Sequence, residues 1–552
     1  MSILAHFPTN LYSPRQIQKD ILNELEQLLP SYNKIIISAP TGVGKSAIAI
    51  SMARYLGSSF VVTASKYLQD QYIKEHTILN PVKGKKNFPC LQIMKLKKVN
   101  DPILAMTQEM TCEKGKCEEK KTALGTEYCE FKPKIIDMEN GEDTSGSCHY
   151  YVQKYHALLS DHSVWNYPMF FQLMKYNKKL FAKYLLKGVA IFDEAHKIED
   201  QIINFIGIDI TKRKLEDCKI DISHYNISEI DGIIDLLDTM RKFYAQELAD
   251  MENKKIPFDS TKYSRFVSEL DKTAGVIGDI QNNKDNFVIS KSYEFDDSFK
   301  PISVKPIDIS NFVDSFFETE CQMFMSATID KQGFCETMGF NPDEVAFIDT
   351  PKSPFAYENR KVHFENVVSL SFKAGIEKEL EAISKIDELL TIHSSERGLI
   401  LTSSIARCYD ILKNLSASNK KRIRICHSTN RNGKTQEQIL REHSDDPTGV
   451  LLSSSLWEGI DLKGDLSRFQ IIAKIPYPPL TDERTKIKRV KYPLWYNSQT
   501  IMKLLQGLGR SIRDENDWAK TYVIDSSIQG LIARGRQSIP KAYYDILGIN
   551  EN

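Results

Sequence analysis

A segment near the N-terminus combines glycines, a lysine and a hydroxyl side chain in the order that phosphate binding requires. It lies between a β-branched run and a helical pattern, so its turns can aim backbone amides at phosphate oxygens while the helix dipole adds positive potential. We expect Lys45 to reach the terminal phosphates and the hydroxyl of Ser46 to ligate Mg²⁺. The segment predicts a nucleoside triphosphate site and consists of Ala39, Pro40, Thr41, Gly42, Val43, Gly44, Lys45 and Ser46.

Two adjacent acids follow an apolar strand pattern farther along the chain. Asp193 and Glu194 come directly after the run 188–192. We expect Asp193 to hold Mg²⁺ through water and Glu194 to orient and deprotonate the attacking water of a hydrolysis reaction. A helix cap is the alternative explanation for an acidic strand end. The phosphate-binding segment upstream favours the catalytic role.

Two arginines near the C-terminus, Arg510 and Arg513, lie three residues apart in a segment that begins at Gln506. On a helix this spacing would put both side chains on one face. Coming from a second domain, they could reach the γ-phosphate and neutralise charge in the transition state, which can raise a rate by about 1,000-fold or more. A solvated or salt-bridged helix face is the alternative for an isolated arginine pair. The two upstream motifs favour the catalytic role.

These motifs need a parallel, helix-flanked sheet to hold them, and the chain alternates strand and helix patterns twice. In the first series a helix is expected at 47–56 and strands at 34–38, 60–63, 188–192 and 322–325. The second series begins after Pro351, with strands expected at 398–402, 422–426, 449–453, 469–475 and 521–524. The sequence therefore predicts two α/β domains.

Two stretches interrupt the first of these domains. From Asn80 to Cys148 the chain has few apolar periods and five clustered cysteines, so this insert needs a staple other than a hydrophobic core. A polar, largely helical stretch follows at 206–286. We expect a first domain of residues 1–80, 149–205 and 287–350, a cysteine insert at 81–148, a helical insert at 206–286 and a second domain at 351–552.

Size and composition set the class of protein. The 552 residues exceed one hydrophobic core, and 41% of them are apolar. Lysine plus arginine (73) equals aspartate plus glutamate (73), so any nucleic acid track must be a local groove. No apolar run approaches the ~18 residues of a membrane span, and the N-terminus lacks a signal pattern. We expect a soluble, cytoplasmic protein without a membrane partner, in which clustered cysteines point to metal more than to disulfides.

Taken in order, these motifs resemble those of the XPD/DinG family of iron–sulfur-containing superfamily 2 DNA helicases. Ala39 fits this resemblance, because helicase versions of the phosphate loop commonly replace the first glycine. The most distinctive further match is the run Trp457-Glu458-Gly459-Ile460-Asp461. The other matching residues are Arg15, Gln18, Thr63, Gln71, Ser326-Ala327-Thr328, Ile475-Pro476-Tyr477-Pro478-Pro479 and the segment from Gln506 to Arg513.

The resemblance implies two RecA-like P-loop NTPase motor lobes, the first interrupted by an iron–sulfur insert and a helical arch insert. It also implies ATP and Mg²⁺ as cofactors, adenine recognition near Gln18, and coupling roles near Thr328 and Asp461. The implied function is ATP-dependent 5′-to-3′ movement on single-stranded DNA and unwinding of forked DNA by a monomer, in repair or replication. The expected catalytic residues are Lys45, Asp193, Glu194, Arg510 and Arg513, and the expected nucleotide contacts are Arg15, Gln18, residues 40–46, Asp461 and Gln506.

A 4Fe–4S cluster in the cysteine insert is a further implication of the resemblance. Cys90 looks like the family's first ligand and Cys148 like its last. Cys112, Cys117 and Cys129 compete for the two middle places, because such a cluster commonly takes four thiolates. Zinc and uncoordinated thiols are the alternatives, although the usual Cys-x2-Cys knuckle is missing from this stretch. The remaining cysteines are expected only to pack: Cys218, Cys321, Cys335, Cys408 and Cys426.

Several further side chains carry weaker expectations. His196 is a candidate for a contact with a neighbouring motif. Contacts with a DNA strand are expected for Thr63, Asn166 and Tyr167, through phosphates and aromatic stacking. Packing of the cysteine insert is expected for Phe88, Tyr150 and Tyr151, with a strand-separating wedge as the alternative.

Two other functions stay open. One is an RNA or RNA–DNA hybrid helicase, since identical motor motifs run on either backbone and only contacts to the 2′-hydroxyl separate them. The other is a nucleic-acid-binding ATP switch or scaffold that does not unwind. An intact set of phosphate-binding lysine, acid pair and arginines disfavours the second, because a switch has no need of all of them.

Overall fold

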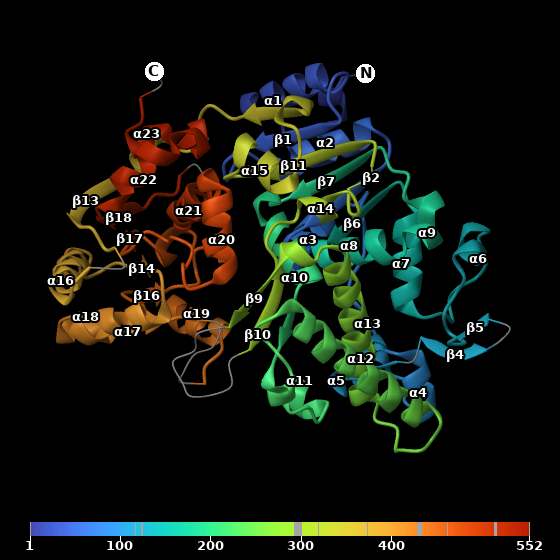
Figure 1. The fold of residues 1–552 in the computed structure, drawn as a ribbon. Coiled ribbons are helices and arrows are strands. Elements are labelled where there is room, and N and C mark those ends of the chain that lie inside the picture. Colours follow the sequence, from blue (N-terminus) through green and yellow to red (C-terminus); the bar gives the residue numbers. More distant parts are fainter. Residues whose placement is uncertain are drawn as a thin grey trace.

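The computed structural model describes residues 2–115, 117–122, 125–291, 301–317, 319–371, 374–427, 433–460, 462–512 and 516–550. These residues form two α/β lobes that lie side by side, each built on a parallel sheet (Figure 1). Residues 34–349 supply the sheet of the first lobe, and residues 362–525 supply that of the second. The predicted α/β class with two lobes is confirmed.

The sheet of the first lobe is entirely parallel, and its strand order does not follow the sequence. Among the described residues it has seven strands, in the order β12-β1-β11-β7-β2-β6-β3. β11 comes after both inserts yet lies between β1 and β7, pairing Ser38 with Ser326 and Asp193 with Met325. The strands are β1 (Lys34–Ser38), β2 (Ser59–Thr63), β3 (Asn80–Pro81), β6 (His162–Asn166), β7 (Val189–Asp193), β11 (Cys321–Ser326) and β12 (Val345–Asp349).

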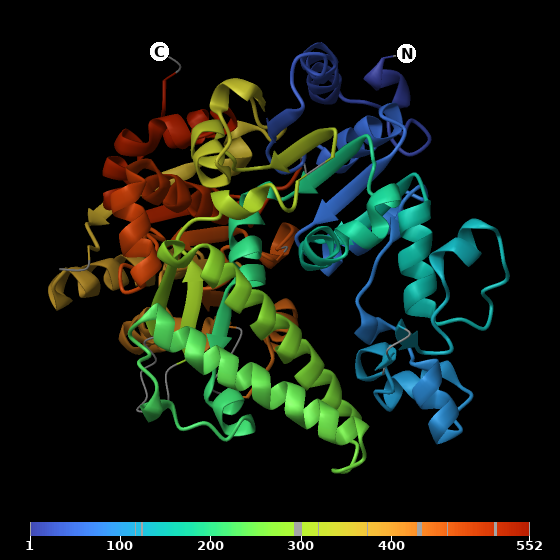
Figure 2. The same cartoon turned by 45° about the vertical axis from the view of Figure 1, so that its right-hand side comes forward.

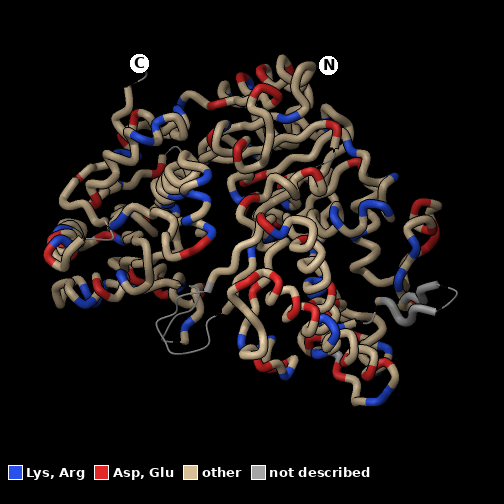
Figure 3. Tube along the Cα trace, in the orientation of Figure 1, with Lys and Arg blue, Asp and Glu red and all other residues tan. Residues whose placement is uncertain are grey.

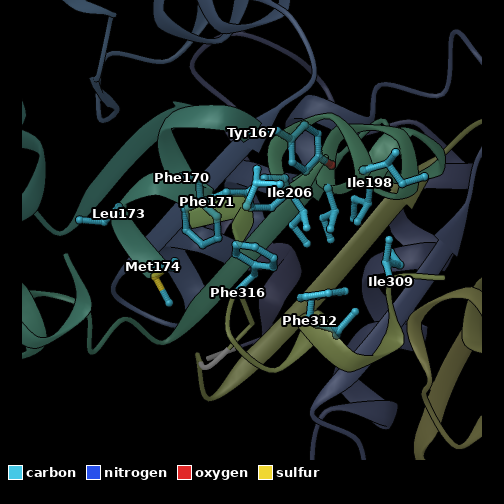
Figure 4. Packing of buried hydrophobic residues seen from close by; sticks show 14 of the residues in the cluster. Tyr167, Phe170, Phe171, Leu173, Met174, Ile198, Ile206, Ile309, Phe312 and Phe316 are labelled. Carbon is cyan, nitrogen blue, oxygen red and sulfur yellow. The ribbon is translucent and has the colours of Figure 1, made fainter. Parts of the chain in front are cut away.

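Helices cover both faces of this sheet and enclose two apolar cores. On one face Phe171 packs against Phe316, and Ile198 from a neighbouring helix belongs to the same cluster (Figure 4). On the other face the helix after β1 buries nearly its whole length. The helices are α1 (Gln16–Leu28), α2 (Lys45–Tyr55), α3 (Lys66–Glu75), α7 (His149–Leu159), α8 (Tyr167–Tyr176), α9 (Lys178–Phe181), α10 (Ile198–Ile206), α14 (Ser310–Val313) and α15 (Lys331–Met338).

The cysteine insert is a small unit beside the first lobe with very little apolar core. One cluster consists of Cys90, Cys112, Cys148 and Tyr150, and a second centres on Met94. Such limited burial agrees with the expectation that the insert needs another source of stability. Its elements are α4 (Leu91–Lys97), α5 (Pro102–Thr107), β4 (Glu118–Thr122), β5 (Gly125–Tyr128) and α6 (Ile135–Glu139).

The chain between β7 and β11 contains an antiparallel sheet that was not predicted from the sequence. In the part of the chain that the structure describes, this sheet has three strands, β8 (Ile208–Ile210), β10 (Ile302–Pro306) and β9 (Phe287–Lys291). It carries α11 (Lys212–Asp217) and the long pair α12 (Ile230–Glu252) and α13 (Ser260–Asn282), which run side by side below the lobes (Figure 2). The Ser264 hydroxyl of α13 donates to the carbonyl of Glu113, so the helical insert touches the cysteine insert.

The second lobe repeats the parallel architecture. Its sheet has, over the described ranges, six strands in the order β13-β18-β17-β14-β16-β15. These are β13 (Val362–Val368), β14 (Gly398–Leu401), β15 (Ile423–Ile425), β16 (Val450–Ser453), β17 (Phe469–Ile472) and β18 (Lys520–Asp525). Its helices are α16 (Ile376–Ile392), α17 (Ile405–Asn414), α18 (Ala417–Arg422), α19 (Gln436–Asp445), α20 (Glu483–Lys491), α21 (Pro493–Leu508), α22 (Ser527–Gly535) and α23 (Tyr544–Leu547).

Every strand expected from the sequence is present, with its ends within three residues of the predicted ones. The parallel sheets also contain β3, β6, β12 and β13, which were not predicted. Each of these lies at or near a sheet edge, where apolar patterning is weaker. No helix in the described ranges combines the length and the apolar character needed to cross a membrane.

The core of the first lobe provides a stability prediction. Phe171 is fully buried, and its ring centre lies 4.6 Å from that of Phe316. We expect Phe171→Ala to lower the free energy of unfolding of this lobe by about 3–5 kcal/mol, because the substitution leaves a cavity. Urea unfolding followed by circular dichroism measures the change. Tyr67→Ala, at a position 75% exposed, is the control and should change stability by no more than about 0.5 kcal/mol; equal effects of the two substitutions would contradict the described core.

Candidate nucleotide site and cysteine pocket

The predicted phosphate-binding segment forms a loop between β1 and α2. Gly42 and Gly44 have φ angles of +88° and +86°, which favour glycine. Gly44 is the N-cap of α2, so the unpaired amides of the first helical turn are available to the loop. The ammonium of Lys45 donates to the carbonyl of Ala39 at 3.2 Å. The remaining loop residues are the buried Pro40 and Val43 and the half-buried Thr41 and Ser46.

Two predicted nucleotide contacts, Arg15 and Gln18, lie against this loop. The guanidinium of Arg15 donates to the carbonyl of Gly42 at 2.6 Å, and the side-chain amide of Gln18 donates to the carbonyl of Val43 at 2.9 Å. The Oε1 atom of Gln18 accepts from the backbone amide of Arg15 at 2.9 Å. The start of α1 is thereby fixed to the loop, and both side chains stand beside the place where phosphate would bind.

Phe355 also contacts the loop, although it carried no signal in the sequence. A Cβ atom built on Gly42 would lie 2.5 Å from the Phe355 ring, so only glycine fits at this position. The carbonyl of Phe355 accepts from Nε of Arg360 at 3.1 Å, and Arg360 binds the second lobe through the carbonyl of Ala542 at 3.2 Å and through Asp545. The segment that joins the lobes therefore lies directly on the phosphate loop.

The acid pair lies at the carboxyl end of β7. Burial and the neighbouring Glu194 raise the pKa of Asp193 to about 6, while Lys45 and a 3.1 Å hydrogen bond from the Tyr72 hydroxyl oppose that rise. Burial acts in the same direction on Glu194, but Lys45, His196 and other cations lower its pKa. The carboxyl group of Asp193 can thus exchange a proton for a cation, while that of Glu194 stays ionised. This combination suits a magnesium ligand beside a general base.

A series of polar contacts links the acid pair to the second lobe. Nδ1 of His196 lies 2.7 Å from the hydroxyl of Ser326 and 3.3 Å from Glu194, which confirms the expected contact of His196 with a neighbouring motif. The Ser326 hydroxyl accepts from the backbone amide of Thr328 at 3.2 Å. The side-chain amide of Gln506, near the end of α21, donates to the Thr328 hydroxyl at 3.3 Å. Gln506 is therefore placed at the boundary of the two lobes, within reach of the site.

Arg510 lies in a turn beyond α21, which ends at Leu508, so the helical condition considered for the arginine pair is not met at this residue. Gly509 ends the helix, and the Arg510 guanidinium donates to the carbonyl of Ile460 at 2.8 Å. Burial favours the neutral form of Glu194, and Arg510 is among the cations that lower its pKa, so this charge acts on the acid pair from the other lobe. Two further predicted residues, Asp461 and Arg513, lie outside the described residues.

The distinctive run at Trp457 makes a second contact between the lobes. The Trp457 indole is buried and donates to the carbonyl of Thr402 at 3.1 Å. Glu458, the next residue, pairs with Lys197 of the first lobe at 2.7 Å and lies 4.0 Å from Nε2 of His196. Lys197 lies three residues after Glu194, so this ion pair links the second lobe to the first beside the acid pair.

The five cysteines of the insert line one pocket. The sulfur atoms of Cys112 and Cys148 lie 3.6 Å apart. Hydrogen bonding to Cys112 lowers the pKa of Cys148 to about 6 and that of Cys90 to about 7, which favours thiolates at neutral pH. The half-buried Cys117 and Cys129 complete the lining. The donor set is the one that a thiolate-ligated metal group requires.

Aromatic side chains pack around this pocket, in agreement with the packing role expected for them. The Tyr150 ring lies 6.1 Å from that of Phe88 and 5.0 Å from that of Tyr151.

Across the described residues, no group of three or more His, Cys, Asp or Glu side chains is already arranged around one metal position. The sulfur atoms share a pocket without being spaced as ligands.

Two of the three side chains proposed to touch DNA are buried, and those expectations are wrong. Thr63 and Tyr167 are both 0% exposed. The Tyr167 hydroxyl donates to the backbone carbonyl of Asp193 at 3.0 Å, and the Thr63 hydroxyl donates to the carbonyl of Ser65. Asn166 caps α8 by accepting from the amide of Met169 at 3.0 Å. The hydroxyl groups of Thr63 and Tyr167 are therefore used in packing within the first lobe.

Known proteins match this chain along most of its length. The family profile described as helicase C-terminal domain matches residues 386–543, and the profile described as type III restriction enzyme, res subunit, matches residues 11–220. The ATP-dependent DNA helicase YoaA of Haemophilus influenzae is 22% identical, with 94% of this chain and 91% of that protein covered. Together these matches support the XPD/DinG family of superfamily 2 helicases for this chain. The ATP-dependent DNA helicase DinG of Photobacterium profundum is 27% identical over 41% of this chain and 35% of its own length.

Solved structures share the fold of this chain. An XPD helicase superposes with a TM-score of 0.61 at 14% identity, covering 98% of this chain and 99% of that one. Xpd4 of S. tokodaii superposes with a TM-score of 0.55 at 14% identity, covering 97% and 98% of the two chains. The likeness concerns the fold, and it spans both lobes and both inserts.

The buried hydroxyl of Tyr72 provides a test of the pKa of Asp193. Tyr72→Phe removes a donor that stabilises the carboxylate, so the pKa of Asp193 should rise further above its value of about 6. Protons compete with Mg²⁺ for this group, and Mg²⁺ affinity is lost as the pH falls through the pKa. We expect the pH at which affinity is half-maximal to move up by roughly one unit. Magnesium titrations over a pH series measure the shift.

Tyr167→Phe is the matched control for this experiment. It removes an equally buried hydroxyl that donates to the backbone carbonyl of Asp193 rather than to its carboxylate. The pH profile should stay where it is in the wild type. A shift of the same size in both variants, or none in Tyr72→Phe, would show that the hydrogen bond does not set the pKa of Asp193.

Proposed function

We propose that this protein is an ATP-dependent DNA helicase that hydrolyses ATP to move along single-stranded DNA and to unwind forked duplexes. The observation that carries the proposal is the convergence of the phosphate loop, the acid pair and Arg510 from two separate lobes. Curated relatives named as DNA helicases support DNA as the substrate. The RNA or hybrid helicase and the ATP switch stay as alternatives that the experiment below separates.

In this proposal the first lobe binds the nucleotide. Lys45 and the loop amides hold the phosphates, Ser46 and Asp193 hold Mg²⁺, and Glu194 deprotonates the attacking water. Arg15 and Gln18, fixed on the loop, recognise adenine beside Phe355. Bound Mg²⁺ would supply charge neutralisation at the phosphates, and its affinity for Asp193 would fall as the pH drops toward the pKa of about 6.

The second lobe completes the site when the lobes close. Arg510 already acts electrostatically on Glu194, and we assign it, together with Arg513, to the charge that develops on the γ-phosphate. Asp461 and Gln506 report the state of the site to the second lobe, the latter through its hydrogen bond to Thr328. Hydrolysis and loss of phosphate then weaken closure, which is the step that moves the strand.

The domain division predicted from the sequence forms part of the proposal. Motor lobe 1 consists of residues 1–80, 149–205 and 287–350, with the cysteine insert at 81–148 and the arch at 206–286, and motor lobe 2 consists of residues 351–552. The small antiparallel sheet stands at the base of the arch. Family resemblance supports 5′-to-3′ movement, action as a monomer on DNA inside the cell, and a place in repair or replication.

A 4Fe–4S cluster in the cysteine pocket is proposed on the same basis. Five cysteines line the pocket, and two of them have pKa values of about 6 and 7. Cys90 and Cys148 are the outer ligands, and two of Cys112, Cys117 and Cys129 are the inner ones. When bound, such a cluster cross-links a unit that has little apolar core of its own.

ATP hydrolysis by the purified protein tests the main proposal. Single-stranded DNA should stimulate the wild type, and more strongly than RNA of the same length does. Glu194→Gln should lower kcat by about 100-fold or more, because it removes a general base, and Lys45→Ala should abolish turnover. Lys378→Ala, at an exposed site on α16, is the control and should behave as the wild type.

The outcomes separate the alternatives. Stimulation by RNA alone would favour the RNA helicase. DNA-stimulated hydrolysis without displacement of a strand from 5′- or 3′-tailed duplexes would favour the switch. Hydrolysis that is indifferent to nucleic acid, or that persists in Lys45→Ala, would refute the motor assignment.

Metal analysis tests the cluster separately from activity. Protein purified without oxygen should contain roughly four iron and four sulfide atoms per chain and absorb visible light. Cys148→Ser should lose the iron, whereas Cys408→Ser, which alters a buried cysteine of the second lobe, should retain it. One substitution among Cys112, Cys117 and Cys129 should also retain it, because the pocket holds one thiol more than the cluster needs. About one zinc per chain in place of iron would contradict the assignment.

A further inference from the structure

A buried ionic contact joins the lobes close to the acid pair. Glu199 lies in the first turn of α10, five residues after Glu194. Its Oε1 atom accepts from the ammonium of Lys488 at 2.5 Å and from the guanidinium of Arg484, and its Oε2 atom accepts from the indole of Trp495 at 3.0 Å. The two cations belong to α20 and the tryptophan to α21. We call this set of Glu199, Arg484, Lys488 and Trp495 the Glu199 contact.

The Glu199 contact is almost fully removed from water. The side chains of Glu199, Arg484 and Lys488 are 7%, 11% and 1% exposed. Burial opposes ionisation of Glu199, but the two cations lower its pKa to about 2. The ammonium of Lys488 also lies 4.5 Å from the centre of the Trp495 ring. Removing one partner by substitution would leave an uncompensated buried charge, so the contact depends on all of its members.

Further contacts fasten the same two helices to the first lobe. Nε of Arg484 donates to the carbonyl of Pro306 at 2.9 Å. Asp308 accepts from Lys491 at 2.9 Å and from the hydroxyl of Tyr492 at 2.8 Å. Figure 3 shows the run of Lys and Arg along α20, on the side of the second lobe that faces the first. Contacts at both ends of α20 therefore hold this helix against the end of β10 and the residues that follow it.

The other end of α21 is held far more weakly. Gln506 makes a single neutral hydrogen bond of 3.3 Å to Thr328, and the helix ends two residues later. Trp495 and Gln506 are separated by roughly 16 Å at 1.5 Å per residue. Near its start, α21 is therefore held by the buried ionic contact and by a hydrogen bond of 2.5 Å from the Ser498 hydroxyl to Asp330 of the first lobe. Near the nucleotide site it is held by the longer hydrogen bond of Gln506.

We propose that Glu199 is a positioning residue that keeps α20 and the start of α21 on the first lobe throughout the ATP cycle. The second lobe then rotates about the Glu199 contact, and the far end of α21 carries Gln506 and Arg510 toward the acid pair and away from it. This inference rests on the proposed function, because it assigns the pivot of the same motor. Glu199 acts through the position of Arg510 and touches neither ATP nor Mg²⁺.

Hydrogen–deuterium exchange of the wild-type protein tests the pivot directly. Backbone amides of α20 should be equally protected without nucleotide and with a non-hydrolysable ATP analogue, Mg²⁺ and single-stranded DNA. Amides around Gly507 to Ser511, at the far end of α21, should gain protection when the analogue binds. Loss of protection in α20 on nucleotide binding would overturn the proposal, and this measurement does not depend on any variant folding.

Kinetics of Glu199→Gln test the consequence for catalysis. We expect DNA-stimulated kcat to fall at least tenfold while KM for ATP stays within about twofold, because the phosphate loop is untouched. Lys488→Met leaves Glu199 paired with Arg484 and should lose less. The double variant should recover part of the kcat lost in Glu199→Gln, since it buries one uncompensated cation fewer. Recovery of this kind assigns the lost kcat to the uncompensated cations of the contact, and the unchanged KM for ATP separates a positioning role from a general loss of stability.

Glu379→Gln is the matched control, because Glu379 pairs with Arg407 entirely within the second lobe. It should keep wild-type kcat. Wild-type kcat in Glu199→Gln would overturn the positioning role even if the protein is a helicase. Absence of DNA-stimulated hydrolysis in the wild type would refute the proposed function instead, so the two failures can be told apart.

Discussion

The insertion of β11 between β1 and β7 is the constraint on which the rest of the site depends. Ser38 pairs with Ser326 and Asp193 with Met325, so three parallel strands end at the same level. The phosphate loop, the acid pair and the segment reaching Thr328 therefore leave the sheet at one edge, where ligands of such sheets bind. Both inserts precede β11 in the chain. They lie outside the sheet, so β11 can still pair with β1 and β7 (Figure 1).

Convergence at this edge creates an electrostatic problem that the surrounding residues resolve. Two adjacent carboxyl groups are buried together, and the pKa of Asp193 rises to about 6 as a result. Lys45 and the Tyr72 hydroxyl favour the ionised form, and a bound divalent cation would add to both effects. Binding of a divalent cation at Asp193 would therefore be coupled to loss of a proton at pH values near 6.

Motifs with local geometry could be predicted from the sequence, and contacts set by tertiary packing could not. The loop at Lys45 and the acids at Asp193 depend on a strand followed at once by a turn, which the residue pattern records. Burial of Tyr167 depends on how α8 packs against β7, and no pattern within α8 reveals it. The same holds for Phe355 on Gly42, for the antiparallel sheet built from three distant short strands, and for Arg510, which lies in a turn after Gly509 ends α21.

Connections among the parts explain why only one lobe needs to move. The cysteine insert and the arch both emerge from the first lobe, and Ser264 of α13 joins them at Glu113, so they form one frame. The second lobe is attached to this frame at the Glu199 contact, where removing one partner would cost about 3–5 kcal/mol. Its second attachment lies near the acid pair and consists of the Gln506–Thr328 hydrogen bond, which contributes about 1 kcal/mol, and the partly exposed Lys197–Glu458 ion pair. A ligand that changes the acid pair can therefore break and remake the second attachment without disturbing the first. Free energy from ATP is then directed into rotation about a fixed point rather than into separation of the lobes.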